Sequence, residues 1–451
     1  MIGYKRYKVL LGLVVAGCAS TSAFSENNLS NTKNLLEVYQ QAIASSPQLE
    51  SAKYKAKSAD EYSMAQLGLA FPSLTAIATA QTSNVTSGGV SGSLQNFNIQ
   101  LGLSQVLLNF GVFSGYKYSK QLALASRAKY NAVQQAFILQ VAQSYFNVLL
   151  AKDKVSLADA NLKASESTFK QTKLLFSNGM ENEAGLKQAE ATYFQAKATL
   201  TKDENTLKVS YYDLYTLTGV IDKELVPLRS NVKYRMPLHD DVNYWLKLAK
   251  KNNFDLISQR YKSEASASAV SAITSTFLPN FTLVANYGVS NYSGSQQVFS
   301  VSAITAPHIK TGYIGLNMSW NIFNGGTNFA ERVQAASNYD ASVYTTLNQT
   351  RVLEEQTSND FHNLKALVDQ IKALSQSVKS SKLSYQQFIE RYRIGTATIT
   401  DVLDQQNSLF ESTTKLASAR YDYINAMLQL KYDAGTISLK DIRYFNSWLT
   451  N

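Results

Sequence analysis

The 451-residue chain has one cysteine, six prolines and three histidines. Because a lone cysteine has no partner within the chain, a disulfide framework is excluded. The histidines, His239, His308 and His362, stand far apart, and no acidic or cysteine residue completes a metal-ligand spacing around them, so we expect no metal site. The sequence also lacks a phosphate-binding glycine loop, a nucleophile elbow and a catalytic cysteine motif. We therefore expect neither an enzyme nor a bound cofactor.

Beyond the amino terminus, no segment has the ~18 to 20 continuous apolar residues that a membrane helix needs. If the chain spans a membrane, it must do so with strands. The amino terminus has a basic stretch that ends at Lys8, an apolar core at 9–16 and small residues after it, which is typical of a secretory signal. We expect this leader to cover 1–23, or 1–17 if the tract before Cys18 is a bacterial lipobox and Cys18 becomes lipidated.

The excess of positive charge is spread along the chain. Loss of residues 1–17 removes three positive charges and no negative ones, which lowers the net charge from +10 to +7. Tracts such as 151–166 interleave lysine with acidic and amide side chains. We interpret this pattern as a solvated helix surface rather than a nucleic-acid patch.

Glycine and proline are absent from two long runs, 116–178 and 327–394, and each run ends at a glycine, Gly179 or Gly395. A helix over either run would be about 100 Å long, which no compact domain holds. The runs lie roughly 215 positions apart, a period that predicts two tandem repeats. Shorter matches share an offset of 207 positions: Leu49 with Leu256, Tyr54 with Tyr261, and Pro72 with Pro279.

Each half carries two stretches in which apolar and polar residues alternate, the pattern of a half-buried strand. We expect one hairpin in each half, with strands at about 72–84, 95–107, 279–291 and 310–323. Their lengths suit either tilted membrane strands or a small soluble sheet with one dry face. Four strands cannot close a barrel and open edges are not tolerated in lipid, so a membrane form demands that several chains pool their strands.

Apolar and small residues in the first long run recur at alternating steps of four and three, from Phe137 to Phe176. Such a repeat lets helices wind around each other. The segments after Gly179 and Gly395 carry matching seams. Each half should therefore end in an antiparallel pair of long helices joined by a tight turn. An ordinary helix bundle without a channel would have the same seams.

The most specific sequence pattern lies in the second turn, where residues 392–396 read YRIGT and residues 401–404 read DVLD. Together with the leader, the hairpins and the tract NLLEVYQQAIASSPQL at 34–49, it resembles the TolC-type outer-membrane efflux protein family over essentially the whole mature chain. The resemblance implies an exit duct that passively carries drugs, toxic small molecules or secreted proteins to the exterior. The alternative is a trimeric coiled-coil stalk or adhesin, which would not need two repeated hairpin units.

The resemblance also implies a fold and partners. The fold would be a mixed α and β membrane protein of mainly long helices, in which three copies close a 12-stranded β-barrel that an α-helical barrel continues across the periplasm. The repeats would span 31–219 and 242–434, with a linker at 220–241 and an equatorial segment at 435–451. The partners would be outer-membrane lipid, a periplasmic adaptor and an inner-membrane pump of the RND, ABC or MFS type, and not nucleic acid.

By the same resemblance, Gly179, Met180, Gly395 and Thr396 lie in the periplasmic tips that touch the adaptor, and Tyr392 is a gate contact. The rest of the family's gate matches only in part. Its basic residue corresponds to Ala397 and its acidic partner to Gly185, although Glu181 and Glu183 are nearby. We therefore expect tips that are held more loosely, or by different contacts.

Asp401 and Asp404 are three positions apart, so both face the same side of a helix. In three copies, six carboxylates could ring the constriction and favour cations. Thr398 and Asp401 also have the spacing of a capping box, and an acidic first turn suits the helix dipole. Both interpretations stay open at this point.

Overall fold

The computed structural model describes residues 32–87, 90–294 and 308–450. The chain divides into Met1–Thr32 and one compact unit, Lys33–Asn451, which contains all the described helices and strands. The expected leader and Cys18 lie outside the described residues. None of the described helices combines the length and the apolarity that a membrane crossing requires.

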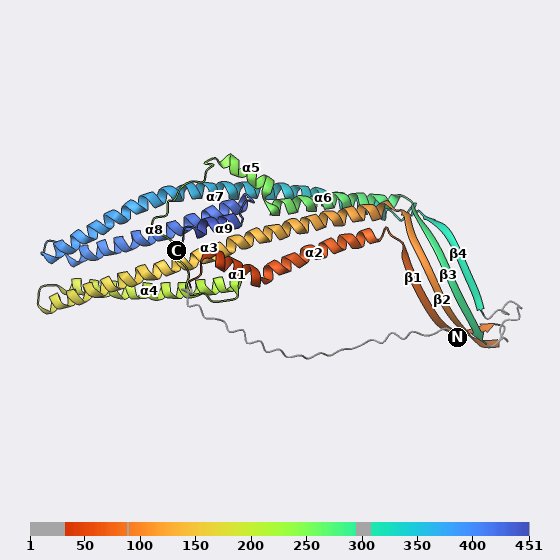
Figure 1. Cartoon of the computed structure of the whole chain (residues 1–451), viewed down its shortest axis with the longest axis horizontal. Coiled ribbons are helices and arrows are strands. Elements are labelled where there is room, and N and C mark those ends of the chain that lie inside the picture. The colour runs from red at the N-terminus through yellow and green to blue at the C-terminus, as the bar shows by residue number, and fades with distance from the viewer. Residues whose placement is uncertain (1–31, 88–89, 295–307, 451) are drawn as a thin grey trace, which may run out of the picture. The chain divides into compact units, whose positions relative to one another are not determined.

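Two long helices dominate the unit, α3 (Phe110–Ser177) and α7 (Thr327–Arg393). Each follows a β-hairpin and is followed by an antiparallel return helix, so one order of elements occurs twice (Figure 1). The other elements of the first half are α1 (Leu35–Ser45), α2 (Pro47–Gly68), β1 (Ser73–Ser87), β2 (Val90–Leu108) and α4 (Glu183–Thr218). Those of the second half are α5 (Val242–Asn252), α6 (Phe254–Thr274), a short 3-10 helix (Ser275–Phe277), β3 (Asn280–Gly294), β4 (His308–Ser319), α8 (Ile399–Asp433) and α9 (Leu439–Asn446).

The helix α3 starts six residues before the glycine-free run. The side-chain oxygen of Asn109 accepts from the amides of Gly111 and Val112 at 2.9 and 3.2 Å. This N-cap satisfies amides that lack an intrahelical partner, so the helix begins at Phe110 and includes Gly111 and Gly115.

The four strands form one antiparallel sheet in the order β1-β2-β3-β4. The two hairpins therefore join through β2 and β3, and β1 and β4 are the free edges. The sequence led us to expect β4 to reach residue 323, but it ends at Ser319. Its neighbour β3 begins at Asn280, directly opposite Ser319, so the residues after Ser319 have no strand to pair with.

The two faces of the sheet differ in polarity. On one face, polar side chains of neighbouring strands bond to each other. Gln100 Nε2 donates to Asn286 Oδ1 at 3.3 Å, and Asn286 Nδ2 donates to the Tyr313 hydroxyl at 2.6 Å. The other face carries large apolar side chains that are 37 to 74% exposed, namely Phe97, Ile99, Leu101, Leu103, Ile314, Leu316 and Met318. The single chain thus leaves an apolar sheet face uncovered.

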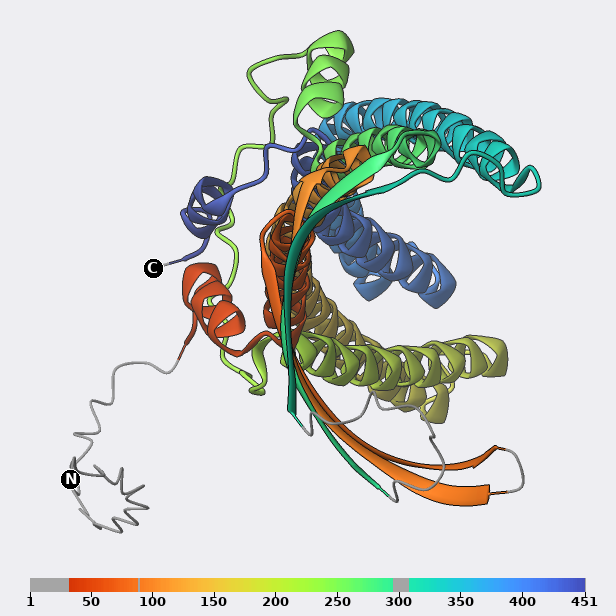
Figure 2. The same cartoon turned by 90° about the vertical axis from the view of Figure 1, so that its right-hand side faces the viewer.

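Four helices continue the four strands. The helices α2, α3, α6 and α7 pack side by side in that order and form a curved layer (Figure 2). Along the chain, α2 leads into β1, β2 into α3, α6 into β3 and β4 into α7. Each strand is therefore extended by a helix in the same lateral order. The edge strands β1 and β4 are extended by the edge helices α2 and α7.

The main core lies at a level that we call the waist, where α1, α9 and the segments 219–241 and 435–450 cover α3 and α8. Phe146 is 0% exposed there. Its ring centroid lies 5.6, 6.4 and 6.1 Å from those of Tyr145, Tyr421 and Phe445. Aromatic residues from both halves thus fill one core.

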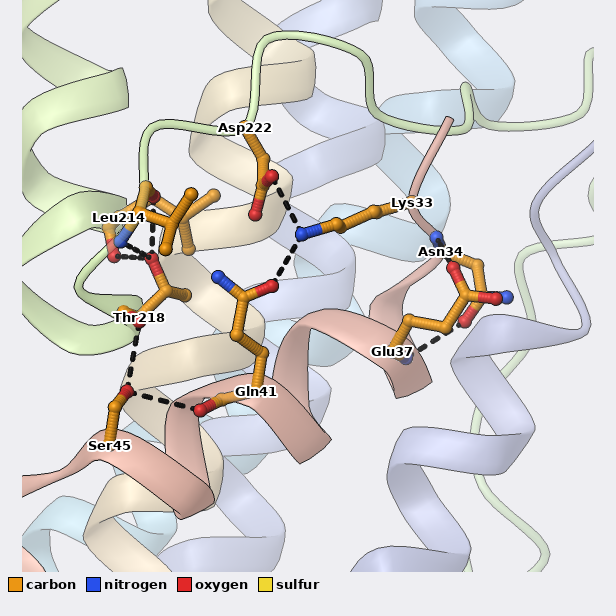
Figure 3. Close-up of polar contacts among 9 residues, drawn as sticks. Lys33, Asn34, Glu37, Gln41, Ser45, Leu214, Thr218 and Asp222 are labelled. Atoms are coloured by element: carbon orange, nitrogen blue, oxygen red, sulfur yellow. Dashed lines mark hydrogen bonds and ion pairs between the residues drawn. The ribbon is translucent and has the colours of Figure 1, made fainter. Parts of the chain in front are cut away.

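Polar contacts tie α1 to the linker that follows α4 (Figure 3). Lys33 Nζ pairs with Asp222 Oδ1 at 2.8 Å and donates to Gln41 Oε1 at 2.5 Å. At the other end of α1, Ser45 Oγ donates to the Thr218 carbonyl at 2.9 Å. Both ends of α1 are therefore held against the last turn of α4 and the residues after it.

Candidate functional site

Each antiparallel helix pair reverses at a left-handed glycine, at the end of the unit opposite the sheet (Figure 1). Gly179 has φ of 71° and Gly395 has φ of 77°. The amides of Gly179 and Met180 donate to carbonyls in the last turn of α3 at 3.0 and 2.9 Å, and those of Gly395 and Thr396 do the same in α7 at 3.0 and 2.8 Å. Both turns are Schellman motifs, which explains why a glycine ends each long run.

The two helix pairs touch near these turns. Ala189 of α4 and Ile399 and Leu403 of α8 form a small buried cluster, against which Phe169 and Tyr392 pack. This tip cluster joins the turn of the first half to the turn of the second half. Its apolar contacts need no charged partner, so they differ in kind from the polar links of the family's gate.

Gly185 has a packing role in this cluster. A Cβ atom at this position would lie 2.9 Å from Ile399 Cγ2 and 2.7 Å from Glu181 Oε1, closer than real Cβ contacts. The glycine therefore lets α4 approach α8. The sequence identified Gly185 only as the place where the family's acidic residue is missing.

Tyr392 supplies a polar link between the two turns. Its hydroxyl donates to Glu181 Oε2 at 3.1 Å, which joins the last turn of α7 to the loop before α4. Burial and the hydrogen bond to Glu181 raise the pKa of Tyr392, so the phenol stays a protonated donor. The acidic partner of Tyr392 is thus Glu181, four positions before Gly185.

The basic residues of the second turn have local partners. Arg393 pairs with Glu390 at 2.8 Å, and Arg391 Nη2 donates to the Thr396 carbonyl at 3.4 Å. Ala397 is partly buried and has no polar side-chain atom. Within the described residues, no basic side chain takes the place that the family's gate residue would have.

Asp401 and Asp404 have different surroundings. The amide and hydroxyl of Thr398 donate to Asp401 Oδ2 at 2.9 and 2.7 Å, and the Asp401 amide donates back to Thr398 Oγ1 at 3.2 Å. The hydrogen bonds from the Thr398 amide and hydroxyl lower the pKa of Asp401. Asp404 is exposed and has no hydrogen bond or ion pair among the described residues. Asp401 therefore caps α8, and Asp404 is left free.

Comparison with known proteins identifies the family. The model of the family described as outer membrane efflux protein matches residues 38–220 and 245–436. The chain belongs to the outer membrane efflux protein family. The matched segments contain both tip turns and all four strands, and the resemblance drawn from the sequence is confirmed.

Relatives of this efflux protein cover nearly its whole length. It is 28% identical to the outer membrane protein TolC of Salmonella enteritidis, over 99% of this chain and 89% of TolC. It is 24% identical to the alkaline protease secretion protein AprF of Pseudomonas aeruginosa, over 90% of this chain and 85% of AprF. The crystal structure of the Campylobacter jejuni CmeC outer membrane channel has the same fold, with a TM-score of 0.79, 19% identity and 98% of each chain covered.

These findings confirm the predicted outer-membrane exit duct for efflux and type I secretion. The family is one of transport ducts and not an enzyme family. Among the described residues, no cluster of three or more histidine, cysteine, aspartate or glutamate side chains is arranged to hold a metal ion.

Sequence reasoning missed three hydrogen bonds between α8 and α3 that join the halves of the efflux protein. Gln406 of α8 is 3% exposed, and its Nε2 donates to Asn161 Oδ1 and Ser165 Oγ of α3 at 3.0 and 2.6 Å. The Tyr421 hydroxyl donates to Asp153 Oδ2 at 2.7 Å. The seam on α3 predicted that Ser165 faces another helix, but a single sequence has no signal that pairs residues more than 200 positions apart.

Proposed function

We propose that three copies of this chain close a continuous tube that serves as the exit duct of an efflux pump or a type I secretion system. The observation that carries the proposal is the matching lateral order of strands and helices, with β1 and α2 at one edge and β4 and α7 at the other. Unpaired strand edges do not persist in lipid. Pairing of β4 with β1 of the next copy removes them, and three copies supply the twelve strands of the family's barrel.

Two exposed apolar surfaces support this assembly. The uncovered apolar face of the sheet, which includes Ile314 and Leu316, suits contact with lipid tails. A second set lies on the edge helix α7, where Phe329, Tyr344 and Leu347 are 65, 70 and 45% exposed. Apolar patches of this kind mark sites of interaction. On α7 the partner would be the edge helix α2 of a neighbouring copy.

The assembly can be tested with the full-length protein purified in detergent. Native mass spectrometry should give three times the mass of the mature chain. The same material should conduct ions in a planar bilayer. A well-folded monomer that does not conduct would overturn the proposal. Mass spectrometry of the mature amino terminus tests separately whether Cys18 is lipidated or removed with residues 1–23.

The closed tips would be held by the Tyr392–Glu181 hydrogen bond and the tip cluster, in place of a charged pair at Ala397 and Gly185. Opening then requires the α7–α8 pair to move away from the α3–α4 pair. Tyr392→Phe removes the hydrogen bond and keeps the ring, so it should raise the open probability in bilayer recordings. An unchanged open probability would mean that the apolar contacts of the tip cluster hold the tips closed without this hydrogen bond.

The free carboxylate of Asp404 supports a ring of acidic side chains at the constriction of the trimer. Asp404→Asn removes this charge and spares the cap that Asp401 forms with Thr398. We expect Asp404→Asn to reduce cation selectivity in planar bilayers without loss of trimer. The double variant with Asp401→Asn should reduce it further. Unchanged selectivity in the double variant counts against the ring.

The tips carry exposed residues that suit an adaptor. Met180 and Ile394 are 71 and 69% exposed, one in each turn beside Gly179 and Gly395. We assign the adaptor contact to these turns, and the adaptor would connect the duct to an inner-membrane pump of the RND, ABC or MFS type. The match to the efflux protein family and the similarity to the protease secretion protein AprF support efflux of small molecules and secretion of proteins alike. Deletion of the gene, followed by drug-susceptibility assays and analysis of the secreted proteins, distinguishes the two cargo classes.

A further inference from the structure

Asp433 is a buried carboxyl at an unfavourable position. It is the last residue of α8 and is 4% exposed. Its Oδ1 accepts from Gln429 Nε2 at 3.1 Å, but its Oδ2 is buried without a hydrogen-bond donor among the described residues. A buried acceptor without a donor costs free energy. The negative end of the helix dipole adds to the cost of a charged carboxylate at this position.

The group that faces Asp433 from α7 is another carboxyl. Asp360 lines one cleft together with Gln429, whose amide bonds to Asp433, and burial, helped by the contact of the Asp360 side chain, raises the pKa of Asp433. Two ionised carboxylates at such a contact repel each other, because neither oxygen can donate. One proton held between them removes the repulsion and supplies the donor that Asp433 Oδ2 lacks. The buried, unpartnered Oδ2 of Asp433 beside a second carboxyl therefore favours a pair that carries one proton.

The pair lies in a tightly packed junction at the waist. Asn253, between α5 and α6, donates from Nδ2 to the Asp433 carbonyl at 3.1 Å and accepts from the Leu256 amide at 3.0 Å. Gly435 has φ of 65°, and a Cβ atom there would lie 2.3 Å from the Asn252 carbonyl oxygen. The end of α8 thus has no room to move unless the neighbouring elements move as well.

Basic side chains on the neighbouring elements are engaged elsewhere. Lys129 of α3 pairs with Asp255 of α6 at 2.6 Å, and the Tyr432 hydroxyl donates to the same carboxyl at 3.4 Å. Two further pairs join α5 to α7 and α8 to α9, namely Lys250 with Glu354 and Lys431 with Asp441. Among the described residues, none of these cations pairs with Asp433 and no ion pair involves Asp360, so an ionised pair would lack a counter-charge.

A cleft of about 380 Å³ lies beside the pair, between α3, α7 and α8. Its lining has two carboxyls and no basic residue: Gln143, Asp360, Asn363, Leu367, Asp422, Asn425, Ala426 and Gln429. Asp422 differs from Asp433 because it is exposed: burial raises the pKa of Asp422, but the opposite charge of Lys154 counters that shift. Asp360 therefore gives the buried pair access to protons from solvent.

We propose that Asp433 and Asp360 hold one proton between them, and that this proton fastens α7 to the end of α8. Loss of the proton brings two negative charges into contact and pushes the two helices apart at the waist. The device acts within one chain, so it does not depend on the trimer or on the duct. The contact between α7 and α8, the helix pair that carries the second tip turn, would therefore depend on pH.

The direction of the pH effect follows from the burial of Asp433. Burial, and then the contact with Asp360, raise the pKa of Asp433 from 3.8 to about 8. A carboxyl with a raised pKa binds its proton more tightly in the folded state than in the unfolded state. The free energy of unfolding therefore falls as the pH rises between about 4 and about 8 and levels off above that range.

The decisive variant is Asp433→Asn, whose amide donates to Asp360 at every pH. In the wild-type protein, the melting temperature should fall between pH 5 and pH 9, and exchange of the Ala434 amide, bonded to the Leu430 carbonyl at 3.0 Å, should accelerate. One pH unit above the pKa of Asp433, its ionised form is about tenfold more abundant than its protonated form. We therefore expect hydrogen exchange at the Ala434 amide to be roughly tenfold faster, beyond the intrinsic effect of pH on exchange. Asp433→Asn should abolish both changes.

The matched control is Asp422→Asn, which removes a carboxyl from the same cleft without touching the pair. It should keep the pH dependence of the wild-type protein. If Asp433→Asn does not fold, Asp360→Asn serves the same purpose, because it also supplies a donor and removes the second charge. A wild-type pH dependence in both Asp433→Asn and Asp360→Asn would overturn the proposal, whether or not the protein forms a conducting trimer.

Discussion

The long helices α3 and α7 occupy equivalent places in the two halves, yet they are buried very differently. α3 has 18 buried residues and α7 has eight, although the two helices are nearly equal in length at 68 and 67 residues. In α7 only Asn328 is buried before Leu353. The difference shows that the place of a helix in the layer, rather than its place in the repeat, decides how much of it one chain can cover.

The neighbours of the two helices explain the contrast. α3 packs against α2 and α6 in the half nearer the sheet and against α4 and α8 in the half nearer the tips. Near the sheet α7 has a long neighbour on one side only, α6, because it is the edge of the layer. Its exposed apolar side chains are therefore left uncovered within one chain, and in the proposed trimer another copy would cover them.

The largest expected effect comes from the buried helix. Phe146→Ala on α3 removes a ring with 0% exposure that packs against Tyr145, Tyr421 and Phe445. We expect a loss of about 3 to 5 kcal/mol in the free energy of unfolding, since removal of a fully buried ring leaves a cavity in the waist. Denaturant titration followed by circular dichroism measures the loss. A cost below about 1 kcal/mol would mean that the waist repacks easily and that burial in one chain is a poor guide to stability.

A smaller effect is expected from a substitution on the exposed helix α7, and this substitution should weaken the association of copies rather than the folding of one chain. Tyr344→Ser on α7 removes a ring that is 70% exposed in one chain. The free energy of unfolding of one chain should change by less than about 0.5 kcal/mol in this variant. The free energy of association at each interface between copies should weaken by about 2 kcal/mol. Dilution of the proposed trimer, followed by mass photometry, measures the change. Tyr344→Phe keeps the ring and is the control, so equal dissociation of both variants would remove Tyr344 from the interface.

The contrast also explains what the sequence could predict. Glycine-free runs and left-handed glycines are local properties, so the helices and both turns were predictable. The seam on α3 correctly marked Phe137, Val141 and Val148 as buried. Which long helix lies at the edge depends on strand pairing between the halves, and this pairing joins residues nearly 200 positions apart, as in Gln100 with Gly288. Local patterns contain no information about it.

In the candidate site too, contacts that are local in the sequence were predictable and contacts between distant segments were not. The capping box of Thr398 and Asp401 depends on a spacing of three, so the sequence could offer it as one of two interpretations, and the structure contains it. The partner of Tyr392 was not predictable, because Glu181 reaches it across two helix pairs. The proposed pair of Asp360 and Asp433 was missed because the two residues lie 73 positions apart, on α7 and α8, and no local pattern joins them.

The turns of the two halves should respond alike to the loss of glycine. Gly179→Ala and Gly395→Ala each force alanine into a left-handed conformation, with no neighbouring atom within 4 Å of the new Cβ. We expect a cost of about 1 to 2 kcal/mol from backbone strain alone in either turn. Gly68→Ala is the control, because Gly68 is helical and equally uncrowded, so it should be neutral or slightly stabilising. Unequal costs in denaturant titrations would show that one turn carries strain or contacts that the other lacks.

The smallest expected effect distinguishes the two tip turns by the side chains that cap the helices after them, α8 and α4. Asp401 caps α8 through Thr398, and the hydrogen bonds from Thr398 hold its pKa below the ordinary value of 3.8. A carboxyl with a lowered pKa stabilises the folded state above pH 3.8, and this contribution is lost as the pH falls through the folded pKa. In the first turn the cap is the neutral side chain of Asn182, which accepts from the Gly185 amide at 2.7 Å. Acidification from pH 5 to pH 3 should therefore lower the protection of the Asp401 amide against hydrogen exchange, measured relative to its intrinsic rate, but not that of the Gly185 amide. An equal loss of protection at both amides would point to a general loosening of the tips.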